Sequence, residues 1–240
     1  MSRRNLAFLA LALVAAAVCA RLGFWQLSRL RERQEANALV ASRLRLPEAT
    51  SLRELPADTA AARFRRVRLT GRFDYDHEVR LTGRSRNGSP GVNVVTPFRL
   101  ADTNVAVLVN RGWVYSPNGA DADLARWREE DGATVVGFVT TLGARRGSAR
   151  SATADARSLR WVDEREIARA AGYGVAPLTV VRQDSASAIA RRDSTPARLA
   201  VPPLDEGPHR GYAVQWFVFA LIALVGPAVL FTKLRREQQR

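Results

Sequence analysis

Two long apolar segments, one near each end of the chain, frame a middle segment in which apolar and polar residues alternate over short runs. The first apolar segment covers residues 6–20 and resumes after Arg21, and the second covers residues 213–231 with Gln215 as its strongly polar residue. A helix needs about 20 such residues to cross a hydrocarbon core of about 30 Å. The pattern therefore predicts two transmembrane helices, with a cleaved signal peptide as the alternative for the first.

Basic residues after the second apolar segment indicate its orientation. They are Lys233, Arg235, Arg236 and Arg240. Because positive charge is retained on the cytoplasmic side, we expect both termini to be cytoplasmic. Four segments follow: residues 1–27, a cytoplasmic tip and the first helix; 28–211, an extracytoplasmic domain; 212–234, the second helix; and 235–240, a cytoplasmic tail.

The middle segment has the pattern of a mixed α and β domain. Strands are predicted at residues 64–73, 78–81, 92–100, 105–114, 134–142 and 177–182, separated by turn residues. A helix is predicted at residues 163–171, with Asp163 as its N-cap and Gly172 after its end. A polar helix at residues 30–42 would continue the first span, and residues 143–156 and 184–208 read as loops. The fold class is therefore α+β, an antiparallel sheet or small barrel between two transmembrane helices.

The large net positive charge of the chain does not by itself indicate a nucleic-acid partner. The formal net charge is +14, which would suit a nucleic acid. However, Lys233 is the only lysine, and the arginines are scattered without interleaved aromatic residues, so we expect no nucleic-acid partner. The charge instead favours an anionic membrane surface or an acidic partner. Cys19 is the only cysteine, which excludes an intramolecular disulfide.

The chain has two histidines, and each is a candidate for chemistry. His77 follows Asp74 and Asp76, which are residue types of a metal or general-base site and would be needed for a periplasmic hydrolase. The alternative is a solvated turn between two strands. His209 precedes the second apolar segment, and Tyr212 and Trp216 follow it at helical spacing.

A neutral imidazole at a membrane surface is a competent axial ligand for haem iron. Aromatic neighbours can cover a porphyrin, and Arg210 could pair with a propionate. The alternative for His209, Tyr212 and Trp216 is an ordinary interfacial belt.

A third candidate is the sequence Asn110-Arg111-Gly112-Trp113 at a predicted strand end. It is either a recognition corner or a strand end with a buried tryptophan.

Four segments of the chain resemble the surfeit locus protein 1 family, in the same order and at compatible spacing. They are residues 23–29 (GFWQLSR), 91–97 (GVNVVTP), 109–114 (VNRGWV) and 209–217 (HRGYAVQWF). The resemblance implies an assembly factor for haem-copper cytochrome c oxidase, not an enzyme, in a bacterial inner membrane or its mitochondrial counterpart. We expect a bacterial source, with the main domain periplasmic.

The resemblance also implies a cofactor and partners. Haem a would be bound transiently, with His209 as the iron ligand and Arg210, Tyr212 and Trp216 around it, and would be presented to the large oxidase subunit. The haem a synthesis enzymes would be further partners, and Asn110, Arg111 and Trp113 would form the partner surface. The family more often has an apolar residue where this chain has Arg210. The alternative function is a scaffold without a cofactor that stabilises an oxidase subunit.

Overall fold

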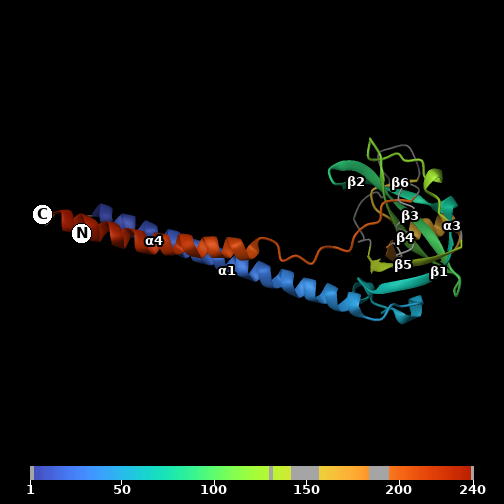
Figure 1. Ribbon diagram of the computed structural model, residues 1–240, viewed down its shortest axis with the longest axis horizontal. Helices are drawn as coiled ribbons and strands as arrows, with labels where there is room; N and C mark the ends of the chain where they lie inside the picture. The colour runs from blue at the N-terminus through green and yellow to red at the C-terminus, as the bar shows by residue number, and fades with distance from the viewer. Residues whose placement is uncertain (1–2, 130–131, 142–156, 184–194, 239–240) are drawn as a thin grey trace. The chain divides into compact units, whose positions relative to one another are not determined.

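The computed structural model of the chain (Figure 1) describes residues 3–129, 132–141, 157–183 and 195–238. It divides into two compact units. One unit consists of Met1–Ala41 and Pro203–Arg240, which hold most of α1 (Arg3–Arg45) and all of α4 (His209–Gln238). The other unit is Ser42–Pro202 and holds the strands.

The helices of the first unit run side by side in opposite directions, which brings the two ends of the chain together (Figure 1). Aromatic rings join them: Phe24 and Phe217 have centroids 5.2 Å apart, and Phe8 and Phe231 have centroids 6.3 Å apart. Gly23 permits this approach, because a Cβ atom there would lie 2.7 Å from the Phe217 ring. Both helices are long and apolar enough to cross a membrane, and only 11% of each apolar stretch is buried within the chain. The chain is thus a membrane protein with two apolar helices.

The second unit is built on a sheet that closes on itself. Its strands are β1 (Arg66–Phe73), β2 (Val79–Arg86), β3 (Ser89–Leu100), β4 (Val105–Tyr115), β5 (Gly132–Thr140), β6 (Ser158–Leu159) and β7 (Gly174–Arg182). Strands β1, β5, β7, β4 and β3 pair in this order, and β3 also pairs with β1, which closes a five-stranded barrel. Strands β2 and β6 extend the sheet beyond β3. The short helices are η1 (Leu52–Glu54), α2 (Thr59–Ala62), η2 (Tyr75–His77), η3 (Ala125–Trp127) and α3 (Glu164–Ala171).

Alternation of side chains fills the barrel. Along β1 every second residue is buried, as expected for a strand with one face in a core. The interior cluster includes Val67, Leu69, Phe98, Val107 and Val109. Helix α3 begins as predicted, since the Asp163 side chain accepts from the backbone N–H groups of residues 165 and 166. It ends at Gly172, whose φ of 73° is the left-handed conformation that glycine adopts readily.

The predicted fold class is confirmed, and the structure differs from the prediction in several details. The pairs β4–β7 and β2–β6 are parallel, not antiparallel. The second strand continues to Arg86 where residues 78–81 were predicted. Part of the predicted loop 184–208 is ordered against the barrel, since Ala197 forms a bridge with Trp113. The predicted loop 143–156 lies outside the described residues.

Candidate functional site

His209 is held by a residue of the other apolar helix. Its Nδ1 atom lies 2.8 Å from Oε1 of Gln26, a side chain that is only 9% exposed in the last apolar turns of α1. An amide oxygen can only accept, so Nδ1 is the donor in this bond, and in the neutral ring the lone pair is then on Nε2. Such an outer partner fixes the ring orientation and tautomer of a metal-binding histidine. The sequence analysis missed Gln26, although it is the polar residue of the GFWQ segment.

The turn that leads into α4 is also tied to α1. Gln34 donates to the carboxylate of Glu206 at 2.8 Å, and Asn37 donates to the carbonyl of Asp205 at 2.8 Å. The side chain of Asp205 in turn accepts from the backbone N–H of Gly207 at 3.0 Å. His209 therefore starts its helix from a turn with fixed geometry, and it is the first residue of α4, three positions earlier than predicted.

The other predicted cofactor residues lie on two sides of α4. Tyr212 and Trp216 follow His209 at intervals of three and seven residues, which places all three on one side of the helix. Tyr212 is 47% exposed, and Trp216 is half-buried with its ring edge-on to Phe219 at 5.9 Å. Arg210 is exposed and lies about 100° around the helix from His209. The helix thus gathers an imidazole and two aromatic rings on one side and an arginine beside them.

Arg111 lies at a β-bulge in the barrel wall. Val94 pairs with Gly112 and Val95 pairs with Asn110, so Arg111 is the extra residue of β4. Gly112 has a φ of 136°, and a Cβ atom there would lie 2.5 Å from the carbonyl oxygen of Ala197. The bulge therefore needs glycine at position 112, and it brings the chain after the barrel against β4.

Every charged donor group of Arg111 is used inside the protein. The guanidinium contacts Glu78 Oε2 at 2.5 Å through Nη1 and Glu129 Oε1 at 3.1 Å through Nε, and Nη2 donates to the carbonyl of Trp127. It also lies over the rings of Phe73 and Tyr75, at 5.5 and 5.1 Å from their centroids. The side chain is fully buried. A guanidinium with this set of partners is a fixed structural element.

Glu129 gathers the remaining charges of this network. Its carboxylate pairs with Arg182 at 2.8 Å and with Arg198 at 2.7 Å in addition to Arg111. Burial raises the pKa of Glu129, but hydrogen bonds from Arg198 and the charges of the three arginines outweigh it, so its pKa is lowered. Burial raises the pKa of Glu78, and the charge of Arg111 offsets this only in part.

The predicted partner surface is thus mostly interior. Asn110 is 5% exposed, and its side-chain oxygen accepts from the Gly112 N–H at 3.1 Å. Trp113 is half-buried, and within the described residues its buried Nε1 has no hydrogen-bond partner. The partner-binding role of Asn110, Arg111 and Trp113 stays a prediction, and for Arg111 it would act through the shape of the corner.

The Asp74 to His77 segment forms the turn η2 and lines a cavity of about 950 Å³. His77 Nδ1 lies 2.8 Å from Asp74 Oδ2, and the hydroxyl of Tyr173 donates to the same oxygen at 2.5 Å. Tyr173 is 99 residues from Asp74 in the chain, so no local sequence pattern predicted this contact. Among the described residues no three or more His, Cys, Asp or Glu side chains gather to hold a metal ion.

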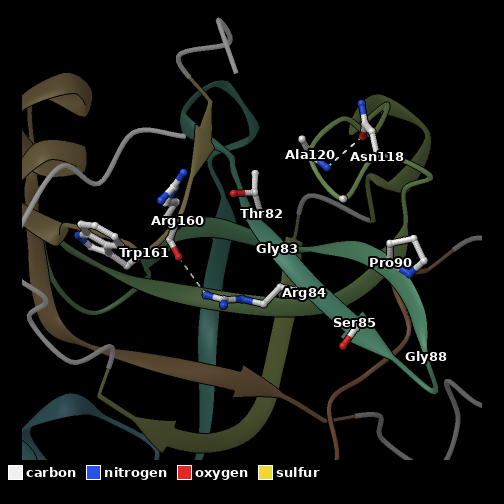
Figure 2. A pocket seen from close by; sticks show the side chains of 11 residues that line it. Thr82, Gly83, Arg84, Ser85, Gly88, Pro90, Asn118, Ala120, Arg160 and Trp161 are labelled. Carbon is white, nitrogen blue, oxygen red and sulfur yellow. Dashed lines mark hydrogen bonds between the residues drawn. The ribbon is translucent and has the colours of Figure 1, made fainter. Parts of the chain in front are cut away.

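A second cavity, of about 790 Å³, lies beside β2 (Figure 2). In Figure 2 the Arg84 side chain reaches the backbone of Arg160, whose carbonyl accepts from it at 3.1 Å. On the other side of the cavity Asn118 accepts from the N–H of Ala120 at 3.0 Å. Arg84 and Asn118 thus form hydrogen bonds within the protein beside this cavity.

Comparison with protein families places both the helix pair and the barrel in one group. The SURF1 family model matches residues 13–221, which include Gln26, the 110–113 corner, and His209 to Trp216. The chain belongs to the SURF1 family. The match covers all seven strands and reaches into both apolar helices.

Individual SURF1 relatives match over shorter stretches. A SURF1-like protein of Monosiga brevicollis is 38% identical over 39% of this chain and 39% of its own length. Surfeit locus protein 1 of Takifugu rubripes is 30% identical over 49% of this chain and 55% of its own length. Cytochrome oxidase assembly protein SHY1 of Saccharomyces cerevisiae is 29% identical over 63% of this chain and 40% of its own length. The matched stretches thus span about half the length of these relatives or less.

Proposed function

We propose that this chain is an assembly factor for haem-copper cytochrome c oxidase, and that it holds haem a at His209 before the large oxidase subunit receives it. Membership of the SURF1 family supports the assembly role, as does the name of the yeast relative, a cytochrome oxidase assembly protein. The observation that carries the haem proposal is the hydrogen bond between Gln26 and His209.

The residues at this site fit a haem. An axial ligand must offer a neutral imidazole nitrogen, and Gln26 leaves Nε2 of His209 as the nitrogen with the lone pair. Tyr212 and Trp216 would offer aromatic surface to the macrocycle on the same side of α4. Arg210 would be long enough to reach a propionate from the neighbouring side of the helix. The bound group would supply its iron chemistry only after transfer to the oxidase.

The site suits a carrier better than a permanent holder. His209 is half-buried at the first turn of an otherwise exposed helix, so a ligand there is not enclosed. One imidazole gives one protein bond to the metal, which an acceptor with two placed ligands can displace. The role of Gln26 is to orient the ring without competing for the metal, since its amide faces Nδ1.

The localisation that goes with this function is a bacterial inner membrane crossed twice. Both termini would be cytoplasmic and the barrel periplasmic, on the evidence of the basic residues after the second apolar segment. Alkaline phosphatase fused after residue 186 should therefore be active, and a fusion after Arg240 should be inactive. The opposite pattern would reverse the orientation.

The haem proposal is tested by co-expressing the chain with haem a synthesis enzymes and recording the spectrum of the detergent-purified protein. His209→Ala should abolish or shift the Soret band while membrane insertion and expression remain, because no fully buried contact is lost. His77→Ala is the matched control, since it removes the other histidine. If His209→Ala kept its full haem content with an unshifted spectrum, ligation by His209 would be wrong.

The second candidate is a scaffold without a cofactor, and the interior of the barrel favours it. The Arg111 network fixes the 110–113 corner and the chain at residues 197–198, which gives a rigid surface that a subunit could bind. Under this function the purified protein carries no haem under any co-expression condition, yet loss of the chain still lowers oxidase content in membranes. The spectrum above therefore separates the two candidates.

A further inference from the structure

Two arginines oppose each other across the seam that closes the barrel. Arg72 of β1 and Arg99 of β3 are direct partners in the antiparallel pair. Side chains at directly opposed positions lie on the same face of the sheet, and like charges there destabilise the pair. The neighbouring pair, Phe73 and Phe98, packs with ring centroids 4.9 Å apart. Arg72 and Arg99 therefore stand on the outer face, where both line the cavity of about 950 Å³ beside η2.

Among the described residues, no carboxylate neutralises this pair. Within the described part of the chain, neither Arg72 nor Arg99 forms an ion pair. The guanidinium of Arg99 instead lies over the ring of Tyr173, 5.2 Å from its centroid. A third arginine, Arg128, lines the same cavity and lies 5.3 Å from the centroid of the Tyr75 ring. Stacking on an aromatic face orients a guanidinium and leaves its N–H groups available to an oxyanion.

Asp74, an acidic residue that lines the same cavity, is already hydrogen-bonded within the protein. Asp74 accepts from the N–H of Asp76 at 3.1 Å through Oδ1, and from His77 at 2.8 Å and Tyr173 at 2.5 Å through Oδ2. Burial raises the pKa of Asp74, but the hydrogen bonds from Tyr173 and His77 outweigh it, so its pKa is lowered and it stays ionised. Asp76, the other carboxylate of the cavity, is exposed to solvent. Asp74 thus positions Tyr173 under Arg99 and directs Nε2 of His77 away from its own carboxylate.

We propose that this cavity binds a phosphate group, held by Arg72, Arg99 and Arg128 with His77 beside them. A single phosphate dianion neutralises both opposed arginines at once, whereas one carboxylate carries only one charge. Its tetrahedral oxygens can also reach donors from several directions, which suits guanidinium groups that come from β1, β3 and the chain after η3. The proposal is independent of haem binding, because it uses no residue of α1 or α4.

The phosphate could be free or could belong to a lipid headgroup, and two probes separate these sources. Full-length protein in a detergent without phosphate is titrated calorimetrically with inorganic phosphate, or with water-soluble dihexanoyl phosphatidic acid, at constant ionic strength. Tighter binding of the lipid probe indicates a headgroup, and equal binding indicates that only the phosphate is recognised. Absence of saturable binding for both probes would contradict the proposal.

The variants Arg72→Gln and Arg99→Gln test the site itself. Each should weaken phosphate binding by at least about tenfold, because a charge-assisted hydrogen bond is lost. Each should also raise the unfolding temperature of the phosphate-free protein, since the repulsion across the seam is removed. At a given phosphate concentration, phosphate should then raise that temperature less than it does in the wild type.

A matched control comes from the second cavity. Arg160→Gln removes an arginine beside that cavity (Figure 2) and should leave phosphate affinity unchanged. His209→Ala should also leave it unchanged, so that failure of the haem proposal is distinguishable from failure of this one. If Arg99→Gln and Arg160→Gln bound phosphate equally well, the arginine pair would not be the site.

Discussion

His209 and Arg111 are both nitrogen-bearing side chains held by a polar partner from another element, but their surroundings differ. Arg111 is fully buried and contacts two carboxylates, a carbonyl and two aromatic rings. His209 is half-buried, and within the described part of the chain its ring has one hydrogen-bond partner, Gln26. A polar side chain whose donors and acceptors are all hydrogen-bonded within the chain stabilises the fold. A side chain that keeps one nitrogen without a partner can instead bind a ligand. The contrast supports a structural role for the barrel corner and agrees with the binding role that we propose for the helix pair.

The largest effect on stability is expected when the Arg111 side chain is removed. Arg111→Ala should lower the free energy of unfolding by about 3–5 kcal/mol, because Glu78 would be left buried without its partner. The measurement is thermal or urea unfolding of the detergent-purified protein, followed by tryptophan fluorescence. Arg53→Ala, at an exposed position in η1, is the control and should change little. An Arg111→Ala protein of normal stability that fails in oxidase assembly would instead favour a direct partner role.

Glu129 should show a smaller loss that depends on pH. Glu129→Gln keeps the shape but removes a charge shared by three arginines, which should cost about 1.5–3 kcal/mol near neutral pH. The pKa of Glu129 in the folded protein lies below the ordinary 4.5. Its stabilising contribution is therefore complete above that value and is lost as the pH falls through the lowered pKa. Wild-type stability should fall in this acid range, and the variant should show a flatter profile.

The pKa of Glu78, in the same network, is shifted in the opposite direction to that of Glu129. Its pKa is raised above the ordinary 4.5, mainly by burial, so its ionised form costs stability at neutral pH, and this cost disappears as the pH falls. Glu78→Gln removes this pH-dependent cost, so the variant should lose more stability relative to the wild type at acid pH than at neutral pH. Identical pH profiles for the Glu78 and Glu129 variants would contradict the division of roles between the two carboxylates.

The sequence predicted the local structure well because local patterns determine it. The apolar runs, the alternation along β1 and the Asp163 and Gly172 caps all act within a few residues. Closure of the barrel by β1 and β3, and the parallel pairing of β4 with β7, depend on distant segments that no local pattern relates. The contacts of Gln26 with His209 and of Tyr173 with Asp74 also join residues far apart in the chain, so no local pattern predicted them.

Arg111 illustrates a different limit. It continues the alternation of Val107 and Val109, which belong to the barrel interior, so the strand pattern itself placed it inward. Its charge suggested a surface position, since an arginine is rarely fully buried without a partner. The partners are Glu78 and Glu129, which stand 33 and 18 residues away in the chain. The alternation along the strand thus agrees with the inward orientation of Arg111, but the ion-pair partners that stabilise its buried charge could not be predicted from the sequence.

Gln26→Ala tests the proposed binding role of the helix pair separately from the stability of the barrel. Without the amide oxygen the ring of His209 loses its fixed tautomer and orientation, so haem affinity should fall about tenfold, the lower end for an outer partner of a metal ligand. The stability of the barrel should not change. Haem titration of the purified variant measures the first effect, and Gln34→Ala, which breaks a different contact to the chain before α4, is the control. Unchanged affinity in Gln26→Ala would remove the observation on which the haem proposal rests.

The smallest effect is expected at Tyr212, where ring and hydroxyl can be separated. The side chain is 47% exposed, and within the described residues its hydroxyl forms no hydrogen bond in the structure. Tyr212→Phe should therefore leave both stability and haem affinity within about twofold, because an exposed hydroxyl contributes little. Tyr212→Ala removes the ring that stands one turn after His209 and should weaken haem binding by a few fold through the loss of apolar contact. Haem titrations of the two variants give the comparison directly. If Tyr212→Phe lost as much affinity as Tyr212→Ala, the hydroxyl itself would contact the ligand, and the site would then offer haem a polar contact at Tyr212 as well as an imidazole.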